Sequence, residues 1–169
     1  MYRYAYAYVG NPEEAEEIVQ ESFLKFYRML MAGEVREHER ALLFRLARNQ
    51  AIDLVRRRAT RRQFTQDVQG GKLVILNPAG PQTPEEILLK KEVRRCADEA
   101  LSRLNSRDRD CLALRRSGLT YREVAEALNL NPKSIGQIIN RALLRFERVY
   151  EQLFGRANHE RGNRDTRRR

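Results

Sequence analysis

The chain has 169 residues and is strongly basic, with 33 lysines and arginines against 23 aspartates and glutamates and a formal net charge of +10. This length fits one domain or two small ones, and the charge predicts a polyanionic partner. Its two cysteines match no metal spacing and make a disulfide scaffold improbable, and it carries no signal peptide and no apolar run of membrane length. We therefore expect a cytoplasmic protein that has no cofactor and does not insert into a membrane.

The first 55 residues combine an aromatic start with an acidic helix. Residues 2–9 could form either a strand or a helix. Asn11 and Pro12 then open a helix of about five turns, because proline fits the first helical position and the glutamates that follow suit a helix N-terminus. Its apolar residues recur at three- and four-residue intervals, which predicts one core-facing stripe: Ala15, Ile18, Val19, Phe23, Phe26, Tyr27, Leu30 and Met31. Seven basic and nine acidic residues in 1–55 suggest a basic protein surface as one partner.

A second long helix is expected from about Arg40 to Gln63, with Leu43, Leu46 and Leu54 on its apolar side. Its C-terminal end is unusually cationic, because no acid lies between Asp53 and Asp67. The arginines in that interval are Arg56, Arg57, Arg58, Arg61 and Arg62. A helix dipole alone would not need so many, so we interpret this end as a phosphate-binding surface.

Residues 64–82 break the helical pattern with glycines, prolines and few charges, which indicates a linker between two modules. Within it, residues 72–76 could form a short strand or dock on a partner. Regular structure restarts at Thr83, which forms a capping box with Glu86, and a helix is expected from Pro84 to about Arg103.

The second helix of this second module begins at Asn105 and Ser106, with Gly118 as its C-cap. Cys111, Leu112 and Leu114 are expected on the buried side of this helix. We interpret Cys96 and Cys111 as small core residues.

The stretch from Leu119 to Phe146 has the pattern of two helices joined by a tight turn. Thr120 and Glu123 form a capping box, and Asn131 and Pro132 fit the cap and first position of a longer second helix. Its apolar face comprises Ile135, Ile138, Ile139, Ala142, Leu143 and Phe146. Its other face offers cations and polar groups: Lys133, Ser134, Gln137, Asn140, Arg141 and Arg145. This pattern is typical of a helix-turn-helix that enters a DNA major groove. An ordinary helical hairpin with a solvated outer face is the alternative.

In this order, the segments resemble the extracytoplasmic-function (ECF, group IV) sigma factors, small alternative sigma subunits of bacterial RNA polymerase. The resemblance rests on PEEAEEIVQESFLKFYR (12–28), similar to the family's core-binding helix, and on LLFRLARNQAIDLVRRR (42–58), similar to its promoter-melting helix. It also rests on LSRLNSRDRDCLALRRSGLTYREVAEALNLNPKSIGQIINRAL (101–143), which is similar to sigma region 4.

The resemblance implies an all-α protein with two small helical domains joined by a flexible linker. Sigma region 2, a helical bundle, would occupy 1–66, the linker 67–83, and sigma region 4 with its helix-turn-helix 84–154. The polar, arginine-rich segment 155–169 is expected to be a disordered basic tail.

The resemblance also implies roles for individual residues. Glu17, Gln20 and Glu21 would face the β′ clamp helices of core polymerase. At the −10 element, Asn49 would help to hold a flipped base, and the backbone would be held by Arg48, Arg56, Arg57 and Arg58. The −35 element would meet Lys133, Ser134, Gln137, Asn140, Arg141 and Arg145. The partners implied are core RNA polymerase through its β′ clamp helices and β flap, promoter DNA, and an anti-sigma factor.

The chain departs from the family pattern at several positions. The family usually has residues ahead of Tyr2, so we expect a misassigned start or a trimmed chain. Leu42 stands where a tryptophan is common, and Gly136 and Ile138 stand where basic residues are frequent. The family's usual −35 sequence preference is therefore not expected to carry over.

The sequence suggests three alternative functions for the whole chain. The first is a promoter-specificity subunit that is not itself an enzyme. The second is a stand-alone helix-turn-helix regulator whose N-terminal half serves dimerisation or sensing, and it would not need core polymerase. The third, an enzyme acting on nucleic acid, is disfavoured because no glycine-rich phosphate loop, HExxH motif or Cys/His metal cluster is found.

Overall fold

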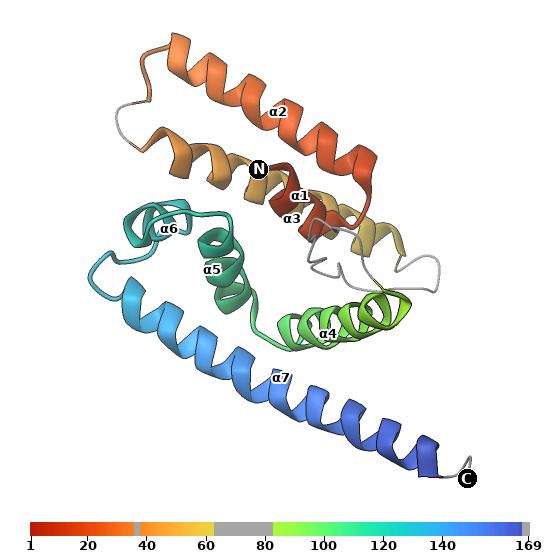
Figure 1. The fold of residues 1–169 in the computed structure, drawn as a ribbon. Helices are drawn as coiled ribbons and strands as arrows, with labels where there is room; N and C mark the ends of the chain where they lie inside the picture. Colours follow the sequence, from red (N-terminus) through yellow and green to blue (C-terminus); the bar gives the residue numbers. More distant parts are fainter. Residues whose placement is uncertain (36–37, 63–82, 167–169) are drawn as a thin grey trace.

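A computed structural model describes residues 1–35, 38–62 and 83–166. These residues form seven helices and no strand, so the expected all-α fold is confirmed (Figure 1). The helices are α1 (Tyr2–Val9), α2 (Pro12–Met31), α3 (Glu39–Arg62), α4 (Pro84–Ser102), α5 (Ser106–Arg116), α6 (Tyr121–Ala127) and α7 (Ile135–Thr166). The expected linker strand at 72–76 lies outside the described residues. None of the described helices is long and apolar enough to cross a membrane.

The N-terminal half, α1 to α3, is built from two long helices and one short one. Residues 2–9 form helix rather than strand, and Gly10 ends that helix in a left-handed conformation with φ of +70°. Asn11 then caps α2 as expected, because its side chain accepts a hydrogen bond from the Glu14 N–H at 3.2 Å. Small residues let the three helices approach closely around a local core: Ala5, Val9, Ala15, Ile18, Ala47 and Ala51.

The predicted stripe on α2 is only partly buried, which corrects the sequence interpretation. Ala15 and Ile18 are buried, but Phe23, Tyr27 and Met31 are 51%, 58% and 70% exposed. The reason is their position around the helix. Ala15, Ile18 and Ser22 lie within about 60° of one another and are buried, whereas Phe23, Tyr27 and Met31 lie about 80–160° further round from Ala15. Only the first of these two stripes faces the rest of the N-terminal half.

The C-terminal half, α4 to α7, places α5 and α6 between the N-terminal half and the long helix α7 (Figure 1). Cys96 and Cys111 are buried and not disulfide-bonded, as expected. The C-cap of α5 is Ser117 rather than Gly118, which follows it in a left-handed conformation with φ of +84°. That conformation explains the glycine at this position.

The helix-turn-helix is present, but its second helix is shifted. The Thr120–Glu123 capping box forms as predicted. Helix α7 begins at Ile135 rather than at Pro132, and the Asn131 side chain accepts a hydrogen bond from the Lys133 N–H at 2.9 Å within the preceding turn. Leu143, expected to be buried, is 43% exposed.

Helix α7 runs to Thr166 and so passes through part of the segment 155–169 that was expected to be a disordered tail. Ahead of that segment, an aromatic ladder lies along α7: the Phe146 and Tyr150 rings stack at 5.8 Å between centroids, and the Tyr150 and Phe154 rings at 5.6 Å. Residues four apart lie one above the other on a helix, so such pairs stabilise it. Residues 167–169 lie outside the described part.

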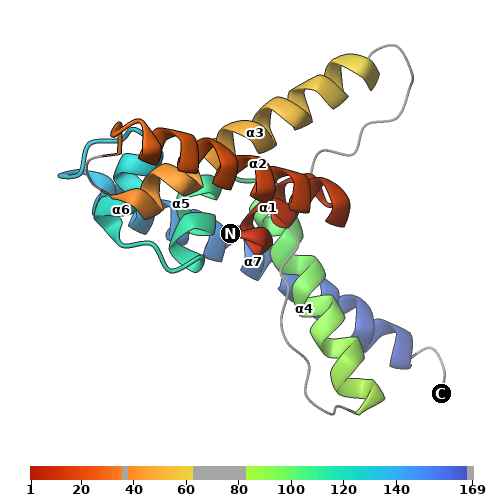
Figure 2. The same ribbon diagram turned by 90° about the horizontal axis from the view of Figure 1, so that it is seen from above.

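The two halves share one hydrophobic core. Tyr4, Ala41 and Phe44 of the N-terminal half belong to the same buried cluster as Leu114 and Val124 of the C-terminal half. Figure 2 shows that the first turns of α3 lie next to the C-terminal half, whereas its last turns project away. The halves are therefore in contact along α3, α5 and α6.

Candidate nucleic-acid interface

The outward face of α7 carries the polar side chains predicted to enter a DNA groove. Gln137, Asn140 and Arg141 are exposed, while Ile135 and Ile139 on the opposite face are buried in the shared core. The Arg141 guanidinium donates a hydrogen bond to the Gln137 side chain at 3.3 Å. Amide and guanidinium groups on one exposed helix face can donate to and accept from base edges in a major groove.

Lys133 and Ser134 lie in the turn ahead of α7 rather than on the helix itself. Lys133 is exposed, and the Ser134 hydroxyl donates a hydrogen bond to the Asn131 carbonyl oxygen at 3.1 Å. Their position before the first turn suits contact with a DNA backbone, because helix N-termini favour phosphates.

Arg145 differs from the other predicted groove residues because it has an acidic partner. Its guanidinium forms an ion pair with Asp108 of α5, whose side chain is 1% exposed. The Asn105 side chain also donates to Asp108, at 2.9 Å. Sequence reasoning missed Asp108. The sequence did carry a signal for it, because Asp108 is an acidic residue at a core-facing position of α5.

The predicted −10 residues of α3 do not lie on one surface. Asn49, Arg56 and Arg57 are exposed. Arg58 lies about half a turn around the helix from Asn49. It donates a hydrogen bond to the Val9 carbonyl oxygen at 3.0 Å and forms an ion pair with Glu14. Arg58 therefore fastens α3 to the end of α1 and the start of α2.

Arg48 is directed into the C-terminal half. Its Nε donates to Asp110 Oδ2 at 2.7 Å, and its Nη2 lies 2.6 Å from the same oxygen. The Asp110 side chain is fully buried, and burial raises the pKa of its carboxyl to about 7. Asp110 was also missed from the sequence, because its partner is distant along the chain.

A mixed acidic and apolar face runs along α2. Glu17, Gln20 and Glu21 are all exposed, as a docking role requires. The exposed Tyr27 and Met31 continue the same stripe, since residues spaced by three, four and seven positions share a helix face. The sequence contained this signal, but the apolar spacing was interpreted as core.

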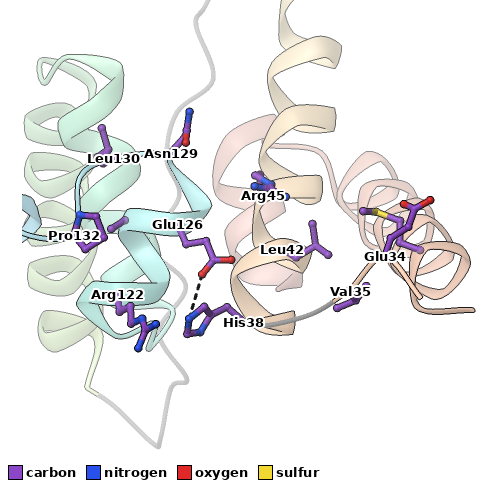
Figure 3. Close-up of a pocket in the computed structure, with 12 residues that line it drawn as sticks. Glu34, Val35, His38, Leu42, Arg45, Arg122, Glu126, Asn129, Leu130 and Pro132 are labelled. Carbon is purple, nitrogen blue, oxygen red and sulfur yellow. Dashed lines mark ion pairs between the residues drawn. The ribbon is translucent and has the colours of Figure 1, made fainter. Parts of the chain in front are cut away.

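A cavity of about 650 Å³ opens between the two halves (Figure 3). Leu42 and Arg45 of α3 line one side, and Arg122 and Glu126 of α6 line the other. His38 spans it, with its Nε2 3.6 Å from a Glu126 carboxylate oxygen. Within the described ranges, no three His, Cys, Asp or Glu side chains are placed to hold a metal ion.

Two protein-family models match this chain, one in each half. Residues 1–61 match the family model of Sigma-70 region 2, and residues 94–146 match that of Sigma-70 region 4. The chain is 24% identical over 145 residues to the ECF RNA polymerase sigma factor SigW of Bacillus subtilis, covering 83% of this chain and 78% of SigW. The chain belongs to the ECF sigma factors.

Two actinobacterial ECF sigma factors are also similar. BldN of Streptomyces coelicolor is 28% identical over 151 residues, and SigE of Mycolicibacterium smegmatis is 28% identical over 142 residues. The alignments cover 88% and 83% of this chain but only 55% and 53% of those proteins. This sigma factor therefore spans about half the length of these two relatives.

The fold is also that of a solved sigma factor. The sigma factor RpoE from Bartonella quintana, determined in complex with the anti-sigma factor NepR, aligns with a TM-score of 0.65 and 22% identity over 89% of both chains. The matched residues place the N-terminal half of this sigma factor in region 2 and most of the C-terminal half in region 4.

Proposed function

We propose that this chain binds core RNA polymerase as an alternative sigma factor, with region 2 melting the −10 element and region 4 binding the −35 element. The observation that carries the proposal is that one chain holds both a region 2 match and a region 4 match, and that the latter presents an exposed polar helix face. A stand-alone regulator would not need region 2, so that alternative is not favoured.

At the −35 element, the outward face of α7 would read bases. Gln137, Asn140 and Arg141 are the candidate readers, because amides pair with adenine and guanidinium groups with guanine. Lys133 and Ser134 would hold the backbone from the turn. Arg145 would reach DNA only from its pair with Asp108, so its contribution would be partly structural.

At the −10 element, α3 would hold the melted strand. Asn49 would contribute hydrogen bonds to a flipped base, since a base leaves the stack only where a pocket compensates for the lost stacking. Arg56 and Arg57 are exposed and would contact phosphates, together with Arg48 once it leaves Asp110. Arg58 would act mainly through the packing of α3 on α1 and α2.

Core polymerase would be bound through α2 and α4. Glu17, Gln20 and Glu21 would meet the β′ clamp helices, and the exposed Tyr27 and Met31 would add apolar contact area. For the β flap, the candidate surface is the group of exposed apolar residues on α4: Ile87, Leu88, Leu89 and Val93.

The structurally similar sigma factor RpoE was determined in complex with the anti-sigma factor NepR. We therefore also propose an anti-sigma factor as a partner of this chain. The site of action would be the cytoplasm, where the polymerase and promoter DNA are found.

In vitro transcription tests the proposed function. Core polymerase supplemented with this chain should start transcripts from a cognate promoter selected from genomic fragments, whereas core polymerase alone should not. Removal of residues 1–62 should abolish initiation. Initiation by the remaining C-terminal half, or failure of the full chain to bind core polymerase, would overturn the proposal and favour a stand-alone regulator.

A further inference from the structure

We propose that Arg48 and Asp110 form a latch that holds the free sigma factor closed, with region 4 seated on the promoter-melting helix α3. The inference rests on the proposed function of α3, and it adds a built-in control of that function. In the closed form, the Asp110 carboxylate of region 4 pairs with the Arg48 guanidinium. That guanidinium would otherwise bind promoter DNA.

The latch joins the two halves at a buried point. Arg48 Nε and Nη2 lie 2.7 Å and 2.6 Å from Asp110 Oδ2. The Asp110 side chain is fully buried and that of Arg48 is 25% exposed. A guanidinium forms the same charge-assisted hydrogen bonds with a carboxylate as with a phosphate. Asp110 therefore competes directly with a nucleic-acid backbone for Arg48.

Further contacts across the same boundary surround the latch. The Arg40 guanidinium donates a hydrogen bond to the Ser117 carbonyl oxygen at 2.9 Å. At the rim, His38 and Glu126 lie 3.6 Å apart. Inside, the Tyr4 ring packs on Phe44 at 5.5 Å between centroids, within the core that the two halves share. The closed arrangement is therefore a specific interface rather than a single ion pair.

The interface is also imperfect, which makes it suitable for opening. The Tyr4 hydroxyl and Asp110 Oδ1 are buried and have no hydrogen-bond partner among the described residues. Buried polar groups without partners carry a free-energy cost. A ligand that binds only the open form can therefore shift the population towards it.

Closure affects the two DNA-binding surfaces unequally. Arg48 is withdrawn from solvent, whereas Gln137, Asn140 and Arg141 on α7 stay exposed. The free chain should consequently bind a −35 duplex while binding a −10 single strand poorly.

Spin labels on the full chain test the latch without DNA. Glu34 and Arg122 are exposed and line the same cavity from opposite halves, so nitroxides on Glu34→Cys and Arg122→Cys report closure by double electron–electron resonance. Cys96 and Cys111 are buried, so the label goes to the introduced thiols. The parent should give one short distance. Asp110→Asn should raise the ratio of open to closed chains about tenfold.

Asp108→Asn is the matched control, because Asp108 is an equally buried carboxylate paired with an arginine of its own half. It should leave the distance distribution unchanged. Should Asp110→Asn lose its helical circular dichroism signal, Arg48→Gln decides instead, since it removes the same ion pair from the partly exposed side of the latch. An unchanged distribution in the folded latch variant, or a broad distribution in the parent, would overturn the latch.

A second measurement separates this inference from the proposed function. A fluorescent −10 non-template oligonucleotide should bind the Asp110→Asn chain about tenfold more tightly than the parent, with −35 duplex binding unchanged. If the spin-label distance shifts but oligonucleotide binding does not, the latch stands and the role of α3 at the −10 element fails.

Discussion

Arg145 of α7 is ion-paired with Asp108 of α5, whose carboxylate is shielded from solvent. The pair ties the proposed recognition helix to the helix behind it. Of the cations predicted to face the groove, Arg145 therefore has a structural task in addition to any contact with DNA.

Arg145→Ala should destabilise the C-terminal half, because it leaves Asp108 buried with its Asn105 hydrogen bonds and with Arg107, whose Nε is 3.9 Å from the carboxylate. Since Arg145 is itself 48% exposed, we expect a loss of about 1–3 kcal/mol in the free energy of unfolding, measured by urea denaturation. Arg141→Ala is the control and should change stability by less than about 0.5 kcal/mol. Equal stability of the two variants would show that the pair contributes nothing.

Arg141→Ala and Arg57→Ala should weaken promoter binding in different ways. Arg141 lies on the reading face of α7, so its loss should cost about 1–3 kcal/mol at a cognate site and less at a scrambled one. Arg57 is an exposed cation on α3, so its loss should weaken binding uniformly and reduce the salt slope by about 1. Fluorescence anisotropy of holoenzyme over a salt series measures both effects. Identical profiles would contradict this division of roles.

Glu17→Lys combined with Glu21→Lys should abolish binding to core polymerase while leaving DNA binding by α7 intact. Both glutamates are exposed on the α2 face that also carries Tyr27 and Met31. Glu147→Lys makes the same kind of charge change at an exposed glutamate of α7, outside this α2 face, and should leave core binding little changed. Native gel shift of core polymerase measures this. Unchanged core affinity in the double variant would mean that another face docks.

The capping box at α6 should contribute measurably to the stability of the helix-turn-helix. Thr120→Ala should cost about 1 kcal/mol in the free energy of unfolding, because a backbone N–H at the start of α6 loses its acceptor. Val124→Ala, which removes core volume instead, gives a larger reference loss of about 1–3 kcal/mol. A Thr120→Ala chain as stable as the parent would show that water replaces the cap.

The same box predicts a pH dependence. The backbone N–H of Thr120 donates to Glu123 and lowers the pKa of that carboxyl below its ordinary value of 4.5. A depressed carboxyl pKa stabilises the fold above the unfolded-state value and loses that effect as pH falls through the folded-state value. The stability difference between the parent and Glu123→Gln should therefore shrink below about pH 4.5. A difference that is constant from pH 7 to pH 3 would contradict this assignment.

Local signals predicted much of the fold. The caps at Asn11 and Thr120 and the proline at position 12 correctly located helix starts, because these features act within one helical turn. The pattern failed where an apolar residue lies outside the buried stripe. Tyr27 is about 120° around α2 from the buried Ala15, and its spacing from Phe23 and Met31 was interpreted as part of the core.

The sequence predicted which residues belong to the site, but not which residues they pair with. Asn140 and Arg141 lie on an exposed face, as their helical spacing indicated. Arg48 and Arg58 look alike in the sequence, yet one meets Asp110 and the other meets Glu14 and the end of α1. Tertiary packing between distant segments determines these partners. A run of arginines in the sequence carries no information about that packing.

Gly118 gives a way to disturb the junction of the halves without removing any charge. A methyl group at this position would lie 3.2 Å from Arg40 Nη2, on a backbone whose φ of +84° disfavours any side chain. Gly118→Ala would make the Arg40 guanidinium give way by a few tenths of an ångström beside the Ser117 carbonyl oxygen, while every ionisable group remained in the chain. Backbone geometry at one uncharged residue thus bears on how the two halves meet, and substitutions there would probe the opening equilibrium through strain rather than through charge.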